Sequence, residues 1–97
     1  MTYSLHPGAE GDLASVLDFY RAAAGVEVAR RFLVEFERVM RLLVENPEFG
    51  TPTSLGRRTY PLRIFPYAVV YRALDSTIRV LVLRHQHQHP KYGGRRR

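Results

Sequence analysis

The spacing of hydrophobic residues predicts two amphipathic helices in the first half of the chain. From Ala9 to Ala24, apolar residues recur every three or four positions, which predicts a helix that Gly25 ends. A second helix is predicted from about Val26 to Asn46, because its apolar residues share one face and Pro47 supplies a stop signal. With one glycine between them, the helices are expected to fold back as an antiparallel hairpin.

Alternating apolar and polar residues predict strands on both sides of these helices. Tyr3 and Leu5 alternate with polar neighbours in "TYSLHP", which predicts a short first strand. After a loop rich in proline, glycine and serine at 47–56, three strands are predicted as a meander. They are "RTYPLRI" (58–64), "YAVVYRA" (67–73) and "TIRVLVLR" (77–84).

The element order β-α-α-β-β-β predicts an α+β fold. In this fold an antiparallel sheet carries the N-terminal α-helical hairpin on one face and leaves the other face partly open. The outer face of the second helix offers ion pairs four residues apart, namely Glu27 with Arg31, Arg31 with Glu35, and Glu37 with Arg41. Those arginines are therefore interpreted as stabilising the helix.

Composition fits one small domain. The chain has 97 residues, of which 45% are hydrophobic, which predicts a single domain at 1–92 followed by a flexible basic tail at 93–97. Apolar runs are far shorter than the roughly 20 residues of a membrane span. No secretory signal is evident in "MTYSLHPGAEGD", so a cytoplasmic location is expected. The absence of cysteine excludes disulfides and thiolate metal sites.

Charge is distributed unevenly along the chain. Residues 1–56 hold five arginines and eight acidic residues, whereas residues 57–97 hold nine arginines, one lysine and a single acidic residue, Asp75. The helices therefore supply the acidic half and the strands the basic half. The open face of the sheet and the C-terminal end are expected to form a positive surface, which attracts polyanions or an acidic protein.

Several motifs in this order resemble the RelE/ParE toxins of type II toxin–antitoxin modules. They are the helix ending in "ENPEFG", Leu62-Arg63 followed by Pro66-Tyr67 and Val70-Tyr71, and the terminal His85-Gln86 with Pro90 and Tyr92. The resemblance covers essentially the whole chain, and the "LRIFPYAVVYR" pattern is closer to the ParE-like side. The chain departs from the pattern at Gln88, where relatives often carry arginine, and at Gly93, where tryptophan is frequent.

This resemblance implies a growth-arresting toxin that a cognate antitoxin holds inactive. The ParE-like branch acts on DNA gyrase, whereas the RelE-like branch cleaves ribosome-bound mRNA without a metal. Gyrase is the favoured target, and a ribosome-dependent endoribonuclease or a non-toxic RNA-binding domain are the alternatives. We expect a homodimer or a toxin–antitoxin hetero-oligomer, with no membrane association and no cofactor.

Metal-free RNA cleavage requires an acid, a base and cations around the phosphate. If the chain is a nuclease, the candidates are Arg63 and Arg84 for the phosphate, His85 as acid or base, and Tyr92 to hold a proton or stack on a base. The alternative interpretation is that the arginines sit at the sheet surface and that Tyr92 packs against its edge. The candidates for binding a target or nucleic acid are Arg57, Arg58, Arg63, Arg84, Lys91 and Arg95.

The spacing of His85, His87 and His89 would place three imidazoles on one face if the strand continued. Pro90 follows directly, no carboxylate or cysteine accompanies the set, and Arg84 disfavours a dication. We therefore expect no metal site.

Overall fold

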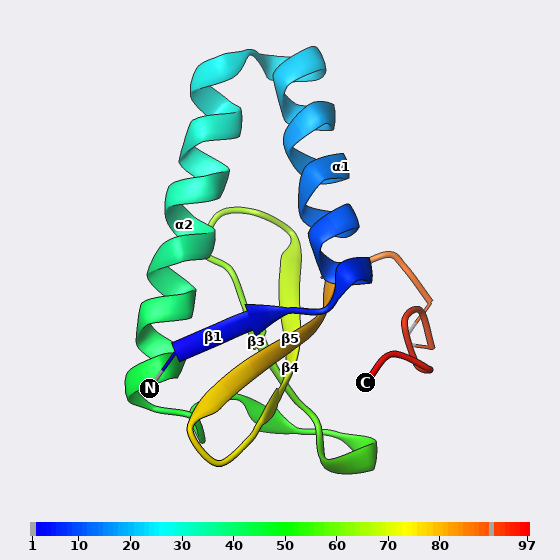
Figure 1. Ribbon diagram of the computed structural model, residues 1–97. Coiled ribbons are helices and arrows are strands. Elements are labelled where there is room, and N and C mark those ends of the chain that lie inside the picture. Colours follow the sequence, from blue (N-terminus) through cyan, green and yellow to red (C-terminus); the bar gives the residue numbers. More distant parts are fainter. Residues whose placement is uncertain (1, 90) are drawn as a thin grey trace.

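The structure is a computed structural model that describes residues 2–89 and 91–97 (Figure 1). Met1, the first residue of the predicted domain, and Pro90, part of the terminal motif, lie outside the described residues. The elements are β1 (Thr2–Leu5), α1 (Pro7–Ala24), α2 (Val26–Glu45), β2 (Thr51–Pro52), a 3-10 turn η1 (Ser54–Gly56), β3 (Arg58–Pro61), β4 (Tyr67–Ala73) and β5 (Thr77–His85). The predicted α+β order is confirmed, and β2 adds a short strand within the predicted loop.

Residues at the start of α1 and between the two helices favour the helical hairpin. Proline is well suited to the first position of α1, and Nδ1 of His6 accepts the N–H of Gly8 at 2.9 Å. Gly25 separates the helices with a φ of 98°, a conformation that residues with a side chain adopt at a cost. Figure 1 shows α1 and α2 side by side, with their turn at the top of the view and the sheet below it.

Ion pairs on the helices differ from the predicted ones. They join Asp18 with Arg21, Glu27 with Arg30, and Glu35 with Arg38, each three residues apart. The ion pairs predicted at a spacing of four residues are therefore not formed among the described residues, and that prediction was wrong. Both spacings bring side chains onto neighbouring turns, and Glu27 and Glu35 are already engaged by the arginines three positions on.

The sheet has five strands in the order β1-β5-β4-β3-β2. The pairs β2–β3, β3–β4 and β4–β5 are antiparallel, so the meander is confirmed, while β1 runs parallel to β5 with Leu5 opposite Val80. The strand predicted at 58–64 ends at Pro61, because the chain turns at Ile64, whose φ is 72°. Residues 67–73 form β4 as predicted, and β5 extends the predicted strand by one residue.

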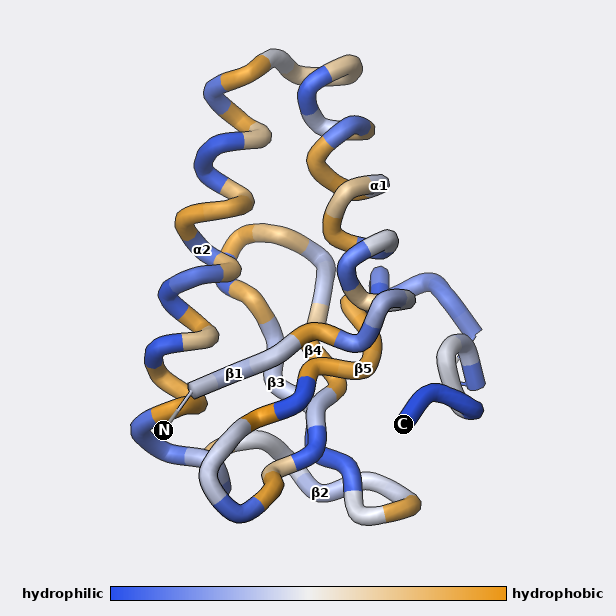
Figure 2. The backbone as a smooth tube through the Cα atoms, viewed as in Figure 1, coloured by the Kyte–Doolittle hydropathy of each residue, from blue (hydrophilic) through white to orange (hydrophobic). Residues whose placement is uncertain are grey.

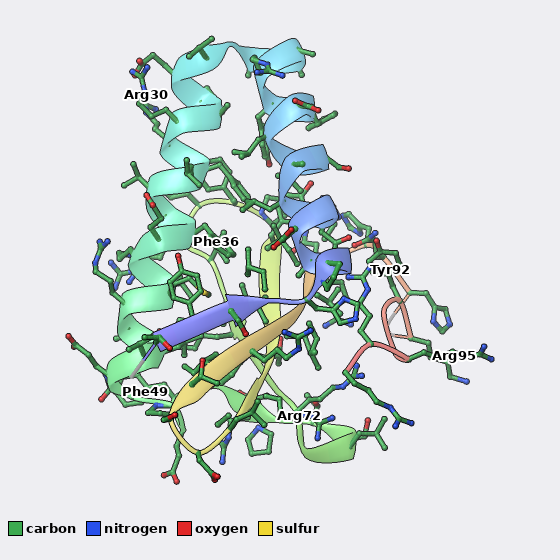
Figure 3. All side chains as sticks on the ribbon, viewed as in Figure 1. Arg30, Phe36, Phe49, Arg72, Tyr92 and Arg95 are labelled. Atoms are coloured by element: carbon green, nitrogen blue, oxygen red, sulfur yellow. The ribbon has the colours of Figure 1, made fainter. Side chains whose placement is uncertain are left out.

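The core lies between the hairpin and one face of the sheet. Its members come from α1 (Ala9, Val16), α2 (Phe32, Phe36, Val39, Met40, Leu43) and the strands (Val69, Tyr71, Ile78, Val80, Leu83). Figure 3 shows the labelled Phe36 pointing from α2 toward the sheet, and Figure 2 shows hydrophobic and hydrophilic stretches alternating along both helices. This alternation places one apolar side of each helix on the sheet.

Tyr71 ties the loop after α2 to the sheet. Its fully buried side chain donates a hydrogen bond to the Pro47 carbonyl at 2.7 Å and accepts one from the Gly50 N–H at 2.9 Å. A side chain at position 50 would collide with it, since an added Cβ would lie 2.5 Å from the Tyr71 hydroxyl oxygen. The hydroxyl therefore serves two backbone groups that have little room for other partners.

We expect Tyr71→Phe to lower the free energy of unfolding by about 2 kcal/mol, because it leaves the Pro47 carbonyl and the Gly50 N–H unpaired. Urea unfolding followed by circular dichroism measures the change. Tyr3→Phe is the matched control, since Tyr3 is partly exposed, and should shift stability by less than about 0.5 kcal/mol. Equal losses of stability in Tyr71→Phe and Tyr3→Phe would contradict a stabilising role of the Tyr71 hydroxyl.

Arginines project from the sheet face turned away from the helices. Along a strand successive side chains point to opposite faces, so Arg72 next to Tyr71, Arg79 next to Val80, and Arg84 next to Leu83 lie opposite the core. Arg72 and Arg79 are directly paired across β4 and β5. The arginines therefore lie on the open face, where the sequence predicted a positive surface.

The C-terminal segment lies over part of this open face. An added Cβ at Gly93 would approach a methyl carbon of Val82 to 2.5 Å. The guanidinium of Arg57 donates to the Gly93 and Gly94 carbonyls at 3.3 and 3.0 Å, and Arg79 Nε donates to the Arg97 carbonyl at 3.0 Å. Residues 93–97, expected as a flexible tail, therefore make specific contacts with the sheet.

Candidate functional site

A hollow of about 940 Å³ lies where the open sheet face meets the C-terminal segment. We call it the basic hollow. Its lining consists of Leu55, Arg57, Arg72, Leu74, Arg79, Gly94, Arg95, Arg96 and Arg97, with no acidic side chain among them. Figure 3 shows the labelled Arg72 and Arg95 near this end of the molecule, far from Arg30 at the hairpin turn. Six of the nine arginines at 57–97 thus gather in one place.

Like charges face one another in the basic hollow. Arg72 and Arg79 occupy directly opposed positions on β4 and β5, an arrangement that destabilises a sheet. Burial, and then the nearby charge of Arg72, lower the pKa of Arg57, whose residue surface is only 8% exposed. Anions bound here would offset this repulsion, and guanidinium groups can hold a phosphate or carboxylate through two parallel hydrogen bonds.

Asp12 on α1 anchors the C-terminal segment. Its carboxylate accepts hydrogen bonds from the Tyr92 hydroxyl at 2.6 Å and from Arg96 Nη1 at 2.6 Å. It also accepts the Leu83 N–H at 3.1 Å, at a point where β1 has already ended. Both members of the Asp12–Arg96 pair are largely buried, and the hydrogen bond with Asp12 is the main cause that raises the pKa of Arg96.

The four predicted catalytic residues do not share one hollow. His85 and Tyr92 line a hollow at the end of β5 that also includes Asp12. Arg63 lines a separate groove against α2, and Arg84 projects from the open face of the sheet. The Tyr92 hydroxyl donates its hydrogen bond to Asp12. The His85 ring packs edge to face against the Tyr67 ring, with 4.9 Å between the ring centroids. The structure therefore brings together the two residues predicted to transfer protons, but not the two arginines predicted to bind the phosphate.

The predicted binding residues also separate into groups. Arg57 and Arg95 line the basic hollow, and Lys91 lines a smaller hollow beside it with His6. Arg58 instead donates to the Gly50 carbonyl at 2.9 Å and so holds the loop after α2. Sequence reasoning missed Arg72 and Arg79, although the strand alternation and the meander were sufficient to place both on the open face.

The histidines do not continue the strand face. β5 ends at His85, and Nδ1 of His85 accepts the N–H of His87 at 3.0 Å, so the chain turns there. Nδ1 of His89 in turn accepts the N–H of Lys91 at 3.1 Å. Among the described residues, no group of three or more potential ligands of the His, Cys, Asp or Glu type is placed to hold a metal ion.

A second, mainly apolar groove of about 460 Å³ runs between α2 and the loop joining β3 to β4. We call it the α2 groove. Its lining residues are Glu27, Val28, Arg30, Arg31, Val34, Glu35 and Arg38 on α2, and Arg63, Ile64 and Phe65 on the loop. Glu35 joins the two walls, since its carboxylate accepts the Arg63 N–H of the loop at 2.6 Å. It also pairs with Arg38 on its own helix at 2.7 Å.

The α2 groove combines a charged pair with a residue in a strained backbone conformation. The guanidinium of Arg38 lowers the pKa of the Glu35 carboxyl most, against an opposing effect of burial. Ile64 holds a φ of 72° with a side chain that is 97% exposed. A left-handed backbone costs a residue with a side chain roughly 1–2 kcal/mol, and such strain tends to persist at functional sites.

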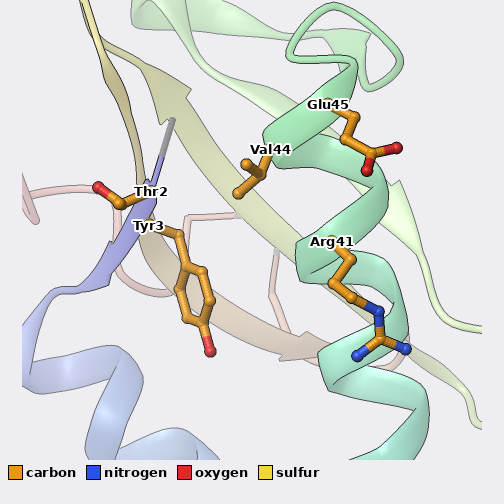
Figure 4. Close-up of a pocket in the computed structure, with 5 residues that line it drawn as sticks. All are labelled: Thr2, Tyr3, Arg41, Val44 and Glu45. Atoms are coloured by element: carbon orange, nitrogen blue, oxygen red, sulfur yellow. The ribbon is translucent and has the colours of Figure 1, made fainter.

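A third hollow of about 360 Å³ lies between the edge strand β1 and α2. Thr2 and Tyr3 form one wall, and Arg41, Val44 and Glu45 form the other (Figure 4). Within residues 2–89 and 91–97, neither α1 nor α2 is long and apolar enough to cross a bilayer.

Comparison with known proteins supports the resemblance noted in the sequence. The family described as "ParE toxin of type II toxin-antitoxin system, parDE" matches residues 3–90. The chain is 30% identical over 86 residues to Toxin ParE2 of Mycobacterium tuberculosis, in strains CDC 1551 / Oshkosh and ATCC 25618 / H37Rv, covering 89% of this chain and 82% of the relative.

A solved structure agrees with the fold. The chain described as "Chromosomal ParDE TA system from P. aeruginosa" superposes with a TM-score of 0.76 at 25% identity, covering 88% of this chain and 95% of that one. The helical hairpin, the meander and the match of nearly the whole sequence lead to one assignment. The chain belongs to the family of ParE toxins of type II toxin–antitoxin systems.

Proposed function

We propose that this protein arrests growth in the cytoplasm by binding DNA gyrase through the basic hollow, and that a cognate antitoxin neutralises it. The observation that carries the proposal is the cluster of six arginines, with no acidic side chain in its lining, on the open face of a ParE-family toxin. Among the described residues of this lining, only Arg96 takes part in an ion pair. Arg57 and Arg79 donate to backbone carbonyls of the C-terminal segment, which leaves the guanidinium groups of Arg72, Arg95 and Arg97 to meet an acidic or phosphate-bearing surface of the target.

The test begins with expression of this chain alone under a controlled promoter. Growth should stop, and co-expression of a small protein encoded beside it should restore growth. The purified chain should then inhibit supercoiling by gyrase at low stoichiometry. Normal growth in the first experiment would contradict a toxic role and leave a plain RNA-binding domain as the better explanation.

We expect Arg72→Ala combined with Arg79→Ala to weaken gyrase inhibition by about tenfold or more. Removing two guanidinium groups takes away charge-assisted contacts, each worth on the order of 1 kcal/mol when it is partly desolvated. Inhibition is measured as the toxin concentration that halves supercoiling, at low and high salt. Arg21→Ala is the matched control, because Arg21 pairs with Asp18 on the exposed side of α1. Equal inhibition by all variants would exclude the basic hollow from target binding.

Ribosome-dependent mRNA cleavage is the alternative outcome of these experiments. Its proposed residues lie in different hollows, with Arg63 beside α2 and with His85 and Tyr92 at the end of β5. Codon-linked cuts in translated message without inhibition of supercoiling would favour it. In that case His85→Ala should slow cleavage strongly while the fold stays intact.

A further inference from the structure

We propose that three arginines in one row across the open face of the sheet bind the phosphate backbone of duplex DNA. They are Arg57, Arg72 and Arg79, all of which line the basic hollow, and we call them the arginine row. Under the proposed function, on which this assignment rests for the source of the DNA, the duplex is the one that gyrase supercoils. The ligand of the hollow is then a phosphodiester, and the central contact is Arg72.

The strand register places the three side chains in one row. Arg72 on β4 is directly opposite Arg79 on β5. On its other side β4 pairs with β3, where Tyr71 is opposite Arg58. One position further along these two segments, Arg57 therefore lies beside Arg72. Neighbouring strands are about 4.8 Å apart, so the backbones of the three arginines fall within roughly 10 Å of one another.

Positive charge in the arginine row lacks a counter-charge within the hollow. Burial, and then the charge of Arg72, lower the pKa of Arg57. Nε of Arg57 is also buried without a hydrogen-bond partner among the described residues, which costs free energy. No acidic side chain is among the lining residues of the hollow. An anion beside Arg72 would offset the repulsion that acts on both of its neighbours.

Arg72 is the member of the row whose guanidinium has no partner among the described residues. Arg57 donates both of its Nη groups to backbone carbonyls of the C-terminal segment, and Arg79 donates Nε to the Arg97 carbonyl. Within residues 2–89 and 91–97, Arg72 joins no ion pair and donates no side-chain hydrogen bond. Its fork can hold two oxygens of one phosphate, while Arg57 and Arg79 supply the surrounding positive potential.

The lining of the hollow favours a duplex over a single strand. Proteins that hold single-stranded nucleic acid stack its bases on aromatic side chains, and no residue of this lining is aromatic. A double helix instead presents closely spaced phosphates on its outside, and contacts to them need no bases. Arg95 and Arg97 line the same hollow and extend its positive charge beyond the row toward neighbouring phosphates.

An acidic protein surface fits the hollow less well. The buried core of a protein–protein interface is mainly apolar and rich in aromatic side chains. Leu55 and Leu74 are the apolar side chains of this lining, and both are exposed, while Gly94 and arginines make up the rest. Phosphate contacts require no apolar anchor, because the release of counterions from DNA drives them. The composition of the hollow therefore matches a DNA backbone better than a protein.

Binding of DNA to the purified chain, without gyrase, tests the assignment directly. The probe is a fluorescein-labelled duplex of about 20 base pairs, followed by fluorescence anisotropy at several salt concentrations. The original chain should bind it saturably. Arg72→Gln should weaken binding about fivefold or more at low salt and reduce the slope of log affinity against log salt by about one, the value for one phosphate contact. Arg21→Gln, a change at an exposed ion pair on α1, should leave both unaltered.

The stability of Arg72→Gln separates a binding role from a structural one. In phosphate-free buffer of low salt, this variant should raise the urea midpoint of unfolding, because it removes the repulsion on Arg57 and Arg79. Added duplex DNA should raise the midpoint of the original chain by more than that of the variant. A variant that loses both stability and DNA affinity, or one that binds DNA as tightly as the original chain, would overturn the assignment.

Competition decides between classes of ligand. At equal ionic strength, a single-stranded RNA of the same length and a glutamate-rich peptide should each displace the labelled duplex only at higher concentration than unlabelled duplex does. RNA that displaces the duplex at lower concentration would identify a single strand as the ligand. The same result with the peptide would identify an acidic protein surface. Either outcome would overturn the assignment to duplex DNA.

Failure of this inference is distinguishable from failure of the proposed function. A chain that arrests growth and inhibits supercoiling, yet does not bind duplex DNA, would count against the arginine row as a DNA site while the toxic role stands. A chain that binds the duplex through Arg72, yet neither arrests growth nor inhibits supercoiling, would count against the proposed function while the DNA site stands.

Discussion

Replacing Asp12 with alanine is expected to lower the free energy of unfolding by about 3 kcal/mol. The change leaves the guanidinium of Arg96 largely buried without its carboxylate partner. It also removes the acceptor of the Leu83 N–H and of the Tyr92 hydroxyl. Breaking a buried pair by removing one partner is more destabilising than the pair itself is stabilising, because the remaining charge stays poorly solvated.

Urea unfolding at neutral pH measures this loss, and Asp18→Ala is the matched control. Asp18 also pairs with an arginine, but both side chains are well exposed, so its removal should change stability by less than about 0.5 kcal/mol. A double-mutant cycle with Arg96→Ala should give a coupling energy of about 1–3 kcal/mol. Additive effects of the two substitutions would show that the pair contributes nothing as a unit.

The consequence of Asp12→Ala reaches the basic hollow. Asp12 holds Arg96, and backbone carbonyls of the same segment accept hydrogen bonds from Arg57. Loss of the anchor is therefore expected to release arginines that line the hollow. Under the proposed function, the acidic half of the chain thus contributes one buried carboxylate on α1 that fixes the position of the C-terminal segment.

Local sequence patterns were sufficient for most of the fold. β4 occupies the predicted residues because "YAVVYRA" combines strong β propensity with turns on both sides. The helices were predicted within about two residues, since proline and glycine mark their ends. Alternation along β5 gave the correct faces for Ile78, Arg79 and Val80, but it placed Leu83 and Arg84 on the wrong faces, because the register shift opposite Val70 and Tyr71 reverses the alternation beyond Leu81.

Local sequence patterns could not predict which strands pair when they lie far apart in the chain. β1 pairs parallel with β5, more than seventy positions away, and no local pattern specifies that choice. A register shift between Val70 and Tyr71 lets Leu81 interrupt the simple alternation of β5. The positive φ of Ile64 could not be predicted from the sequence either, because glycine and asparagine are the residues that usually indicate that conformation.

The candidate site, like the fold, was predicted from the sequence only in part. Charge counting placed the cationic groups on the open face, but not the pairing of Arg72 with Arg79 that concentrates them. The C-terminal arginines resembled a solvated tail, since nothing near Arg96 in sequence is acidic, and its partner Asp12 lies 84 positions earlier. Residue type predicted the chemistry available, and only the fold decided which groups meet.

Replacing Phe32 with alanine is expected to lower the free energy of unfolding by about 4 kcal/mol. Its ring is fully buried and lies 5.7 Å from Tyr20, 5.0 Å from Phe65 and 5.3 Å from Tyr67, measured between ring centroids. These rings come from α1, the β3–β4 loop and β4, so one side chain joins three parts of the fold. Its removal leaves a cavity that rigid neighbours fill only in part.

Phe49→Ala provides the same chemical change at a residue whose surface is 57% exposed, and should cost less than about 1 kcal/mol. Urea unfolding of both variants gives the difference. Because Phe65 rests on Phe32, the larger cavity also loosens the loop that presents Ile64. Equal losses of stability in Phe32→Ala and Phe49→Ala would contradict the role of Phe32 in joining the three parts of the fold.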